Sequence, residues 1–572
     1  MTLIGALQLG QSSLAAQQVG LTVTGNNITN AGTEGYSRQV VRLTPSTPVA
    51  FGQGQSLGTG VTIDSIERQV NAALDESLRD ATSDQNGAGT LDNVLGRLET
   101  TFGILNDNDL SARMSDFFNS FSTLANNPSD TAQRSVVIQN GVSLTGYLQS
   151  LRTQIGAIRE DAQAQIQAQA TSANALVHTI ANLNQQITVS EAGAGSASNL
   201  RDQRDIALGK LSQLMDIRSI DMGNGQVNVL VGSVPIVQGS TTRGISTSQS
   251  YDAAGNMVTI NLTFADNGDT LTVSSGKLGA LVNGRDNYVT PAVAAVDSIA
   301  SGLISTVNGI HSQGQGLSGF SNVTGATQVL SPTATLNAGE ASTGIAFTPV
   351  NGTFNLHIKD QNGQITTKQI IVNLSGTGPQ STLNSLAADI SAAGGGIVNA
   401  IVDSGGHLQI SSNNNHVSFT FSDDTSGALA SLGINTFFTG KNASDIQINT
   451  VLKNTPNLLA TARDNITGSN RNAQALALAG SATVAHLNGR SIKDFYSSYI
   501  GELASHAKNA SDDVTAHGLL RDTLYAQREA ISGVSLDEEA INLTKYQQAF
   551  QGTARYINVI TQMMETVLGL VR

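Results

Sequence analysis

Apolar residues recur at every seventh position along the last part of the chain. A line at half-heptad offsets, from Ala540 to Leu568, is small or apolar with two polar exceptions, and no Pro interrupts it. Ser535 and Glu538 have the spacing of a capping box. The pattern is typical of a long helix that packs lengthwise on another helix. We therefore predict a C-terminal helix with these packing residues: Leu536, Leu543, Phe550, Ile557, Met564 and Val571.

The other end of the chain carries a matching pattern. A turn-like cluster at residues 25–27 is predicted to close an N-terminal helix. The two helical stripes, one at each end of the chain, predict that the terminal helices pair with each other. The residues between them would then form domains inserted between the two helices. The packing line of the N-terminal helix is Leu7, Leu14, Leu21 and Ile28.

Between the termini the hydrophobic period alternates between 3.6 and 2. Short strands are predicted at 39–43 and 61–66, before a long run of helical text. The predicted fold class is multidomain α plus β, with terminal paired helices as a coiled coil, a long helical bundle domain and inserted β-rich outer domains. The predicted parts are a terminal domain (1–66 with 530–572), a helical rod domain (67–216 with 276–330 and 450–529), a small β-rich insertion (217–275) and an outer β-rich insertion (331–449).

Composition narrows the class of protein. The chain has 572 residues, no cysteine and a net charge of −13. The missing cysteines exclude disulfides, thiolate metal sites and thiol catalysis, and the negative charge disfavours nucleic acid and anionic membranes as partners. The first basic residue is Arg38, and no apolar run approaches the length of a membrane span. We therefore expect no cleaved signal and no membrane anchor.

Candidate chemistry is sparse. The sequence lacks the metalloprotease, P-loop and nucleophile-elbow motifs. Gly52, Gly54 and Gly58 resemble a dinucleotide fingerprint only loosely, and a hairpin loop explains them better. Acidic pairs at 423–424 and at 266 and 269 lack the spacing of a calcium loop. The charged run at 202–205 is interpreted as surface ion pairing on a helix. We predict that the chain is not an enzyme and needs no cofactor or metal.

One segment carries a family signature. Residues 25–38 read GNNITNAGTEGYSR and resemble the motif that follows the first helix in flagellar rod, hook and hook-associated proteins. The physical requirements agree, because a glycine permits a positive φ at a corner, Asn side chains cap backbone groups and a tyrosine anchors the turned chain. The motif residues are Asn26, Asn27, Asn30, Gly35, Tyr36 and Arg38.

The C-terminal helix resembles the same family, and internal segments are similar to the members that join hook to filament. Those segments are 116–118, 126–128, 200–205 and 235–241. The resemblance implies an extracellular structural protein of the flagellum, exported by the flagellar type III apparatus. It implies as partners a ring of identical subunits, the hook protein, the next hook-associated junction protein and an export chaperone that binds the C-terminal helix. Alternatives are a hook or filament subunit, and a secreted enzyme or adhesin that works through a β block.

Overall fold

The computed structural model describes residues 2–50, 56–103, 109–192, 195–251, 257–463, 466 and 468–570. The chain divides into two compact units. The first, here called the terminal unit, comprises Met1–Val94, Asp161–Arg285 and Lys508–Arg572. The second, here called the central unit, comprises Leu95–Glu160 and Asp286–Ala507. The predicted helical segment 67–216 is shared between the two units, and the four-part division stays a prediction.

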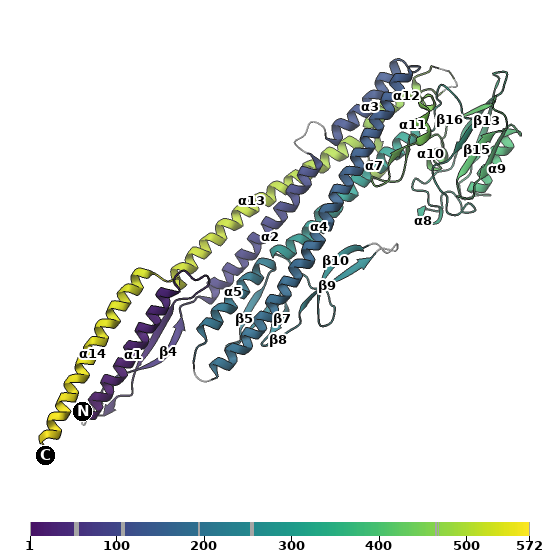
Figure 1. Ribbon diagram of the computed structural model, residues 1–572. Coiled ribbons are helices and arrows are strands. Elements are labelled where there is room, and N and C mark those ends of the chain that lie inside the picture. Colours follow the sequence, from purple (N-terminus) through teal and green to yellow (C-terminus); the bar gives the residue numbers. More distant parts are fainter. Residues whose placement is uncertain are drawn as a thin grey trace. The chain divides into compact units, whose positions relative to one another are not determined.

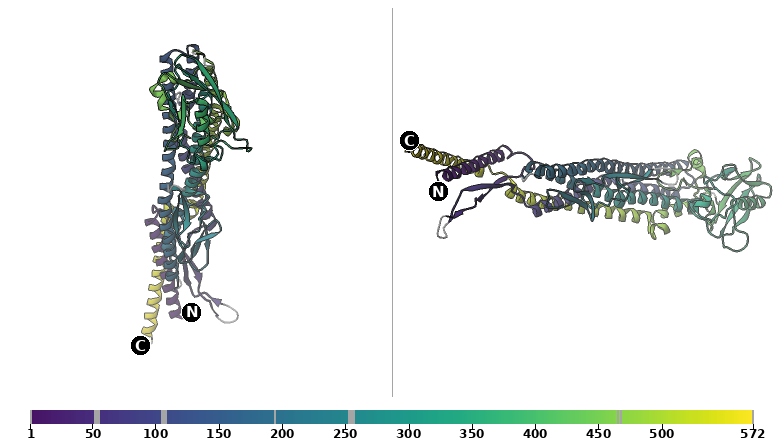
Figure 2. Two further views of the ribbon diagram at one scale, coloured as in Figure 1. Left: turned by 90° about the vertical axis from the view of Figure 1, so that its right-hand side faces the viewer. Right: turned by 90° about the horizontal axis from the view of Figure 1, so that it is seen from below.

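Both chain ends lie in the terminal unit. Helix α1 (Leu3–Thr29) packs against α14 (Leu536–Leu570) on one side and against a β-hairpin on another (Figures 1 and 2). The hairpin strands β1 (Gln39–Pro45) and β4 (Val61–Arg68) pair antiparallel, with a register shift between Arg42 and Leu43. The predicted strands at 39–43 and 61–66 and the two predicted terminal helices are confirmed. Strands β2 (Val49–Ala50) and β3 (Ser56–Leu57) pair with each other nearer the hairpin tip.

A second part of the terminal unit holds its main apolar core. Apolar residues of α4 (Thr131–Glu191), α5 and α6 are buried together with a four-stranded sheet of order β5-β6-β7-β8 and with the β9–β10 hairpin. Val227, Val229 and Val231 alternate along β6, and all three side chains are buried on one face of the strand. The elements are α5 (Ser198–Leu214), β5 (Arg218–Asp221), β6 (Val227–Val231), β7 (Val234–Gln238), β8 (Thr241–Thr242), β9 (Ile245–Tyr251), β10 (Met257–Phe264) and α6 (Gly276–Asn283).

Several helices contribute residues to both units. They are α2 (Ala72–Phe102), α4 (Thr131–Glu191), the π-helical turn η1 (Gly284–Val289) and α13 (Ile492–Ser532).

The helical part of the central unit is organised around phenylalanines. Phe117 packs edge-on against Phe118 and Phe121, and its ring centroid lies 5.4 Å from that of Phe437. The elements are α3 (Leu110–Asn126), α7 (Thr290–His311), α10 (Ala428–Ser431), β17 (Phe438–Thr439), β18 (Gln447–Ile448), α11 (Thr450–Asn454), η2 (Pro456–Leu458), α12 (Arg471–Leu478), η3 (Ala479–Ser481), β19 (Thr483–Val484), η4 (Ala485–Leu487) and β20 (Arg490–Ser491).

The β-rich part of the central unit contains two three-stranded antiparallel sheets, of order β13-β12-β16 and β11-β15-β14. Phe354, Leu356 and Ile358 alternate along β12, and all three side chains are buried. The elements are β11 (Asn322–Thr324), α8 (Glu340–Thr343), β12 (Gly352–Lys359), β13 (Ile365–Val372), α9 (Leu383–Gly394), β14 (Val398–Val402), β15 (Leu408–Ser412) and β16 (Ser418–Ser422).

Two sequence predictions need correction. The predicted helical segment 450–529 is helical only in part, because the described residues between 459 and 491 form only the short α12, two 3-10 turns and the β19–β20 pair. The charged run at 202–205 is also wrong as surface ion pairing, because Asp202 and Arg204 are buried.

One helical stretch, Gly276–His311, is long and apolar enough to cross a membrane by length and composition alone, and half of its most apolar window is buried. Within the central unit, α7 buries Val296, Ile299, Leu303 and Val307, as a core helix does.

Candidate functional site

The contact between α1 and α14 is antiparallel and keeps a seven-residue register. The amide of Asn27 contacts Glu539, Gly20 lies against Tyr546, and the hydroxyl of Ser13 lies 3.3 Å from that of Thr553. These pairs are seven residues apart on both helices. The same register places Ala6 opposite Ile560, and both of these side chains are buried.

Small residues on α1 allow the two helices to approach closely. A Cβ atom on Gly10 would lie 2.6 Å from Cγ1 of Ile557, and one on Gly20 would lie 2.7 Å from the ring of Tyr546. Both distances are too short for real atoms, so a larger residue at either position would force the Ile557 or Tyr546 side chain, or the helix itself, to shift. We call the set Ala6, Ser13, Gly20 and Asn27 the small-residue line.

The predicted packing residues lie close to this contact without being its most buried members. Leu7, Leu14, Leu21 and Ile28 are half-buried and follow the small-residue line by one position. Leu543, Phe550, Ile557 and Met564 are also half-buried, whereas Leu536 is 56% exposed. Val571 lies outside the described residues. The line predicted at half-heptad offsets is wrong as a packing line, because Leu568 is 66% exposed, while Tyr546, Thr553 and Ile560 line the contact.

Asn27 is the centre of a corner where α1, β1 and α14 meet. Its side chain is buried and makes four hydrogen bonds. The amide nitrogen donates to the carbonyl of Gln39 (2.9 Å) and to Oε2 of Glu539 (3.2 Å). The amide oxygen accepts from the hydroxyl of Tyr36 (2.9 Å) and the backbone N–H of Gln39 (3.0 Å). A single side chain therefore ties the end of the first helix to the start of the hairpin and to the last helix.

Arg38 adds a charged clamp at the same corner. Its Nε donates to Oε1 of Glu539 (2.8 Å) and its Nη1 to Oε2 of Glu538 (2.7 Å). Its backbone N–H donates to the carbonyl of Ser532, at the end of α13 (2.9 Å). Glu539 is buried, so its charge depends on Arg38 and on the Asn27 amide. Buried carboxylates are stable only when paired in this way.

The remaining motif residues shape the turn. Helix α1 runs on to Thr29, so the prediction that residues 25–27 end the helix is wrong. Asn30 is the C-cap, and its side-chain amide donates to the carbonyl of Asn26 (3.0 Å). Gly35 has φ of 76°, as predicted, and a Cβ there would also lie 2.4 Å from Cγ1 of Ile206. The predicted anchoring by Tyr36 is confirmed by its bond to Asn27.

The corner is also fastened to α5. Asp202 accepts from the backbone N–H of Ser37 (3.4 Å) and from Nη1 of Arg68 (2.6 Å), which also reaches Asp205 (2.7 Å). Burial raises the pKa of Tyr36 to about 12, and the carboxylates of Asp202 and Glu539 add to this shift. The phenol therefore stays protonated and donates its hydrogen to Asn27.

Sequence reasoning missed Glu539, Gly10 and Gly20. The signal for the glycines was their spacing from Asn27 and Ala6 along one face. From the sequence, Glu538 was named as the capping-box partner of Ser535, and Glu539 was not named. In the structure the side chain of Glu538 is 60% exposed, whereas Glu539 is buried. Among the described residues, no group of three or more His, Asp or Glu side chains is placed to hold a metal ion.

Comparisons with known proteins agree with this architecture. Residues 95–326 match the family model for the flagellar hook-associated protein FlgK helical domain, and residues 527–570 match that for the flagellar basal body rod FlgEFG protein C-terminal region. The chain is 23% identical to flagellar hook-associated protein 1 of Salmonella typhimurium, with 98% of each chain covered. It is 24% identical to the proteins of that name from Escherichia coli (98% of each chain) and Bacillus subtilis (98% of this chain and 97% of the other).

A solved structure is similar in fold. The flagellar hook junction protein FlgK from Burkholderia pseudomallei superposes with a TM-score of 0.51 at 16% identity, covering 80% of this chain and 100% of the other. The matched models and the full-length relatives show which class this chain resembles: structural proteins of the bacterial flagellum, an extracellular appendage, of the hook-associated kind. Within that class, the resemblance predicted from residues 25–38 is confirmed, and the full-length relatives above are all flagellar hook-associated protein 1. Proteins of this class are structural components and not enzymes.

Proposed function

We propose that this chain is a junction subunit that joins the hook to the filament and is required for filament assembly. In this proposal, identical subunits form a ring through their terminal helices. The hook protein lies on one side of the ring and the next hook-associated protein on the other. The support comes from the relatives of the same class and from the surface of α14.

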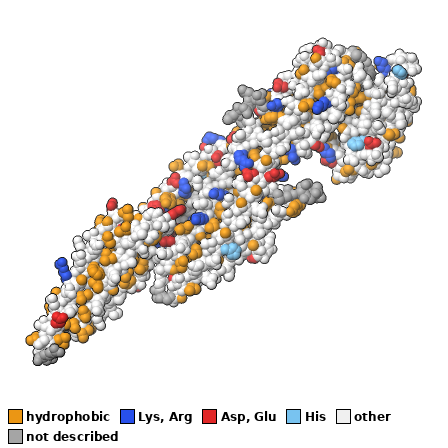
Figure 3. All heavy atoms as spheres, viewed as in Figure 1, with side chains coloured by type: hydrophobic (Ala, Val, Ile, Leu, Met, Phe, Trp, Pro, Cys, Tyr) orange, Lys and Arg blue, Asp and Glu red, His pale blue; other side chains and the backbone are white. Residues whose placement is uncertain are grey.

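The observation that carries this proposal is an apolar stripe on α14 that α1 leaves largely exposed. We call Tyr556, Val559, Met563, Val567 and Leu570 the outer stripe. They are spaced three or four residues apart, so they share one helix face, and their exposed fractions run from 38% to 81%. Figure 3 shows apolar side chains gathered along the terminal helices.

A stripe of this size is costly to leave in water, at about 25 cal/mol for each Å² of apolar surface. Because it continues the α1–α14 contact, a helix pair from a second copy is the occupant that fits it. The neighbouring face of α14 is polar, with Gln551, Arg555, Asn558 and Gln562 exposed. In a tube of subunits, the outer stripe of α14 would face neighbouring subunits, and its polar face would face a water-filled channel.

The same surface bears on export and partners. Before assembly, a separated α14 exposes both its outer stripe and the residues that face α1, so we propose that an export chaperone covers it. The predicted packing residues Leu543, Phe550, Ile557 and Met564 are the proposed chaperone contacts. Export through the flagellar type III apparatus is consistent with a chain without cysteine, which needs no oxidative folding.

The test places charges on the outer stripe. Cells that carry only the Val559→Asp/Met563→Asp chain are expected to build hooks without filaments and to release flagellin into the medium. The matched control is Asn558→Asp/Gln562→Asp, which puts the same two charges one residue away on the polar face and should leave filaments intact. Normal filaments with the stripe variant would overturn the proposal, and unlimited tube growth by the purified chain would favour a hook or filament subunit instead.

A further inference from the structure

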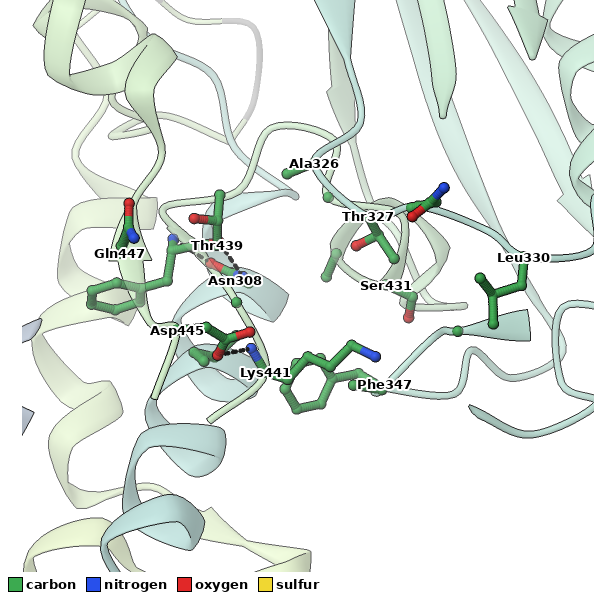
Figure 4. A pocket seen from close by; sticks show the side chains of 18 residues that line it. Asn308, Ala326, Thr327, Leu330, Phe347, Ser431, Thr439, Lys441, Asp445 and Gln447 are labelled. Atoms are coloured by element: carbon green, nitrogen blue, oxygen red, sulfur yellow. Dashed lines mark hydrogen bonds between the residues drawn. The ribbon is translucent and has the colours of Figure 1, made fainter. Parts of the chain in front are cut away.

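The central unit contains a cavity of about 420 Å³. It lies among the last turns of α7, the loops at 326–330 and 344–347, the end of α10 and the β17–β18 pair (Figure 4). A volume of this size falls in the range of small-molecule sites. The cavity is far along the sequence from the corner motif and the terminal helices, and the assembly role does not use it.

The floor of the cavity is held rigidly. Asn308 is buried, and its amide oxygen accepts from the backbone N–H groups of Phe437 (3.0 Å) and Phe438 (2.8 Å). Its amide nitrogen donates to the carbonyl of Phe438 (2.9 Å). The side chain of Asn308 therefore fixes the strand that forms one wall, and the cavity does not depend on a flexible loop at this point.

The charged groups at the cavity are already paired. The ammonium of Lys441 lies 2.7 Å from Oε1 of Glu340, on the short helix α8. Oδ1 of Asp445 accepts from the backbone N–H groups of Lys441 (2.8 Å) and Asn442 (3.0 Å). The one cation that lines the cavity among the described residues is thus paired with a carboxylate, so the cavity offers no free cation for an anionic ligand.

The uncharged polar groups at the cavity are, by contrast, available. The side chains of Thr327, Thr439 and Gln447 line it and make no hydrogen bond to any residue that the structure describes. Figure 4 shows Thr439 and Thr327 on opposite sides of the space, with Phe347 and Lys441 along a third side. The ring of Phe347 is half-buried and Leu330 is 64% exposed, so the cavity also has an apolar wall.

From this geometry we infer that the cavity is a binding site for a neutral saccharide. A sugar ring has an apolar face, which suits Phe347, and a rim of hydroxyl groups, which suits threonine hydroxyls and a glutamine amide that both donate and accept. A purely apolar ligand would leave these polar groups unpaired, at a cost in affinity. An acidic sugar would place its carboxylate beside Asp445 with no free cation to receive it.

The experiment uses the full chain and saturation-transfer NMR with glucose, maltose and the disaccharide of N-acetylglucosamine as probes, and with glucuronate as the charged comparison. At least one neutral sugar is expected to give a saturable signal, while glucuronate gives none. Thr439→Val and Thr327→Val should each weaken binding roughly threefold to tenfold, because each removes one hydrogen bond. Phe347→Leu keeps the apolar volume but loses the flat ring, and should weaken binding similarly.

Two further variants make the test specific. Thr366→Val, on the exposed part of β13, removes a hydroxyl outside the cavity and should change nothing. Glu340→Gln frees Lys441, so it should create binding of glucuronate where the original chain has none. Absence of binding by every neutral sugar overturns the inference, as does binding that survives all three cavity variants. Neither result bears on filament assembly, which depends on the terminal helices.

Discussion

The hydroxyl oxygens of Ser13 and Thr553 lie 3.3 Å apart, although 540 positions separate them along the chain. One heptad away on both helices Gly20 meets Tyr546, and a heptad beyond that Asn27 meets Glu539. The last helix, α14, thus packs against the first, α1, in a fixed antiparallel register. A slip by one residue would move Tyr546 from a glycine to a side chain that cannot accommodate its ring. The register therefore specifies how the two chain ends pair.

The contact between Gly20 and Tyr546 predicts that two glycine-to-alanine substitutions in α1 will differ in their effect on stability. Gly20→Ala places a Cβ about 2.7 Å from the Tyr546 ring, whereas Gly25→Ala meets nothing within 4 Å. Both gain helix propensity, at about 1 kcal/mol, so the difference between them isolates the clash. We expect Gly20→Ala to be less stable than Gly25→Ala by about 1–3 kcal/mol. Amide hydrogen exchange along α14 measures this difference, and equal protection in the two variants would contradict the contact.

Asn27 is expected to be the most sensitive polar residue of the corner. Asn27→Ala removes four hydrogen bonds, and Glu539 keeps only its contact with Arg38. The expected loss is about 3 kcal/mol in the stability of the terminal unit. Asn26→Ala is the control, because Asn26 is exposed and should change stability by less than about 0.5 kcal/mol. Chemical denaturation followed by circular dichroism gives both values. An Asn27→Ala variant with unchanged stability would refute the central role of this side chain.

The two carboxylates that Arg38 contacts should respond differently. Arg38→Ala leaves Glu539 buried without its cation and is expected to cost about 2–4 kcal/mol. Glu538→Ala should cost less than about 1 kcal/mol, because that side chain is 60% exposed. In a Glu539→Gln background, the cost of Arg38→Ala should fall by at least 1 kcal/mol, since no buried charge is left behind. Additive effects in this double-mutant cycle would show that Arg38 and Glu539 act independently.

The burial of His311 leads us to expect that the stability of the central unit depends on pH. Its ring is completely buried, with Nδ1 2.7 Å from the carbonyl of Asn435 and Nε2 accepting from the N–H of Ala460 (3.0 Å). This arrangement requires Nδ1 to carry the proton of a neutral ring. Burial lowers the pKa of His311 from 6.5 to about 4, because the charged form would be desolvated.

The sign of the effect follows from that shift. Between about pH 6.5 and pH 4 the unfolded chain binds a proton at this histidine and the folded chain does not, so stability falls as the pH is lowered through this window. The expected loss is about 3 kcal/mol over the whole window and about 2 kcal/mol between pH 7 and pH 5, and it should be absent in His311→Gln. Hydrogen exchange along α7 at pH 7 and at pH 5 tests this, and a pH dependence identical in the two chains would assign the effect elsewhere.

Much of the fold could be predicted because it is local. The strands at 39–43 and 61–66 and the glycine with positive φ at Gly35 each reflect a few neighbouring residues. Failures occurred where a neighbour distant in sequence decides the outcome. Arg204 is charged and was expected on the surface, but its guanidinium is buried and donates to Asn184 and to the carbonyl of Gly225. The helical segment predicted at 450–529 is interrupted where it packs against residues elsewhere in the central unit, as where the side-chain amide of Asn470 donates to the carbonyl of Ala125.

By itself, the sequence determined that both ends are heptad-patterned helices, that a hairpin follows the first, and that the corner between them needs Gly35 and Tyr36. Only the tertiary structure decided which line of each helix faces the other. The predicted packing line of the N-terminal helix follows the small-residue line by one residue, so the two lines lie on neighbouring faces of α1. Both lines repeat every seven residues, so periodicity alone cannot tell which of them faces α14. Close approach of two backbones selects the small side chains, because Gly20 and Gly10 leave room for Tyr546 and Ile557, and that choice depends on a partner more than 500 residues away.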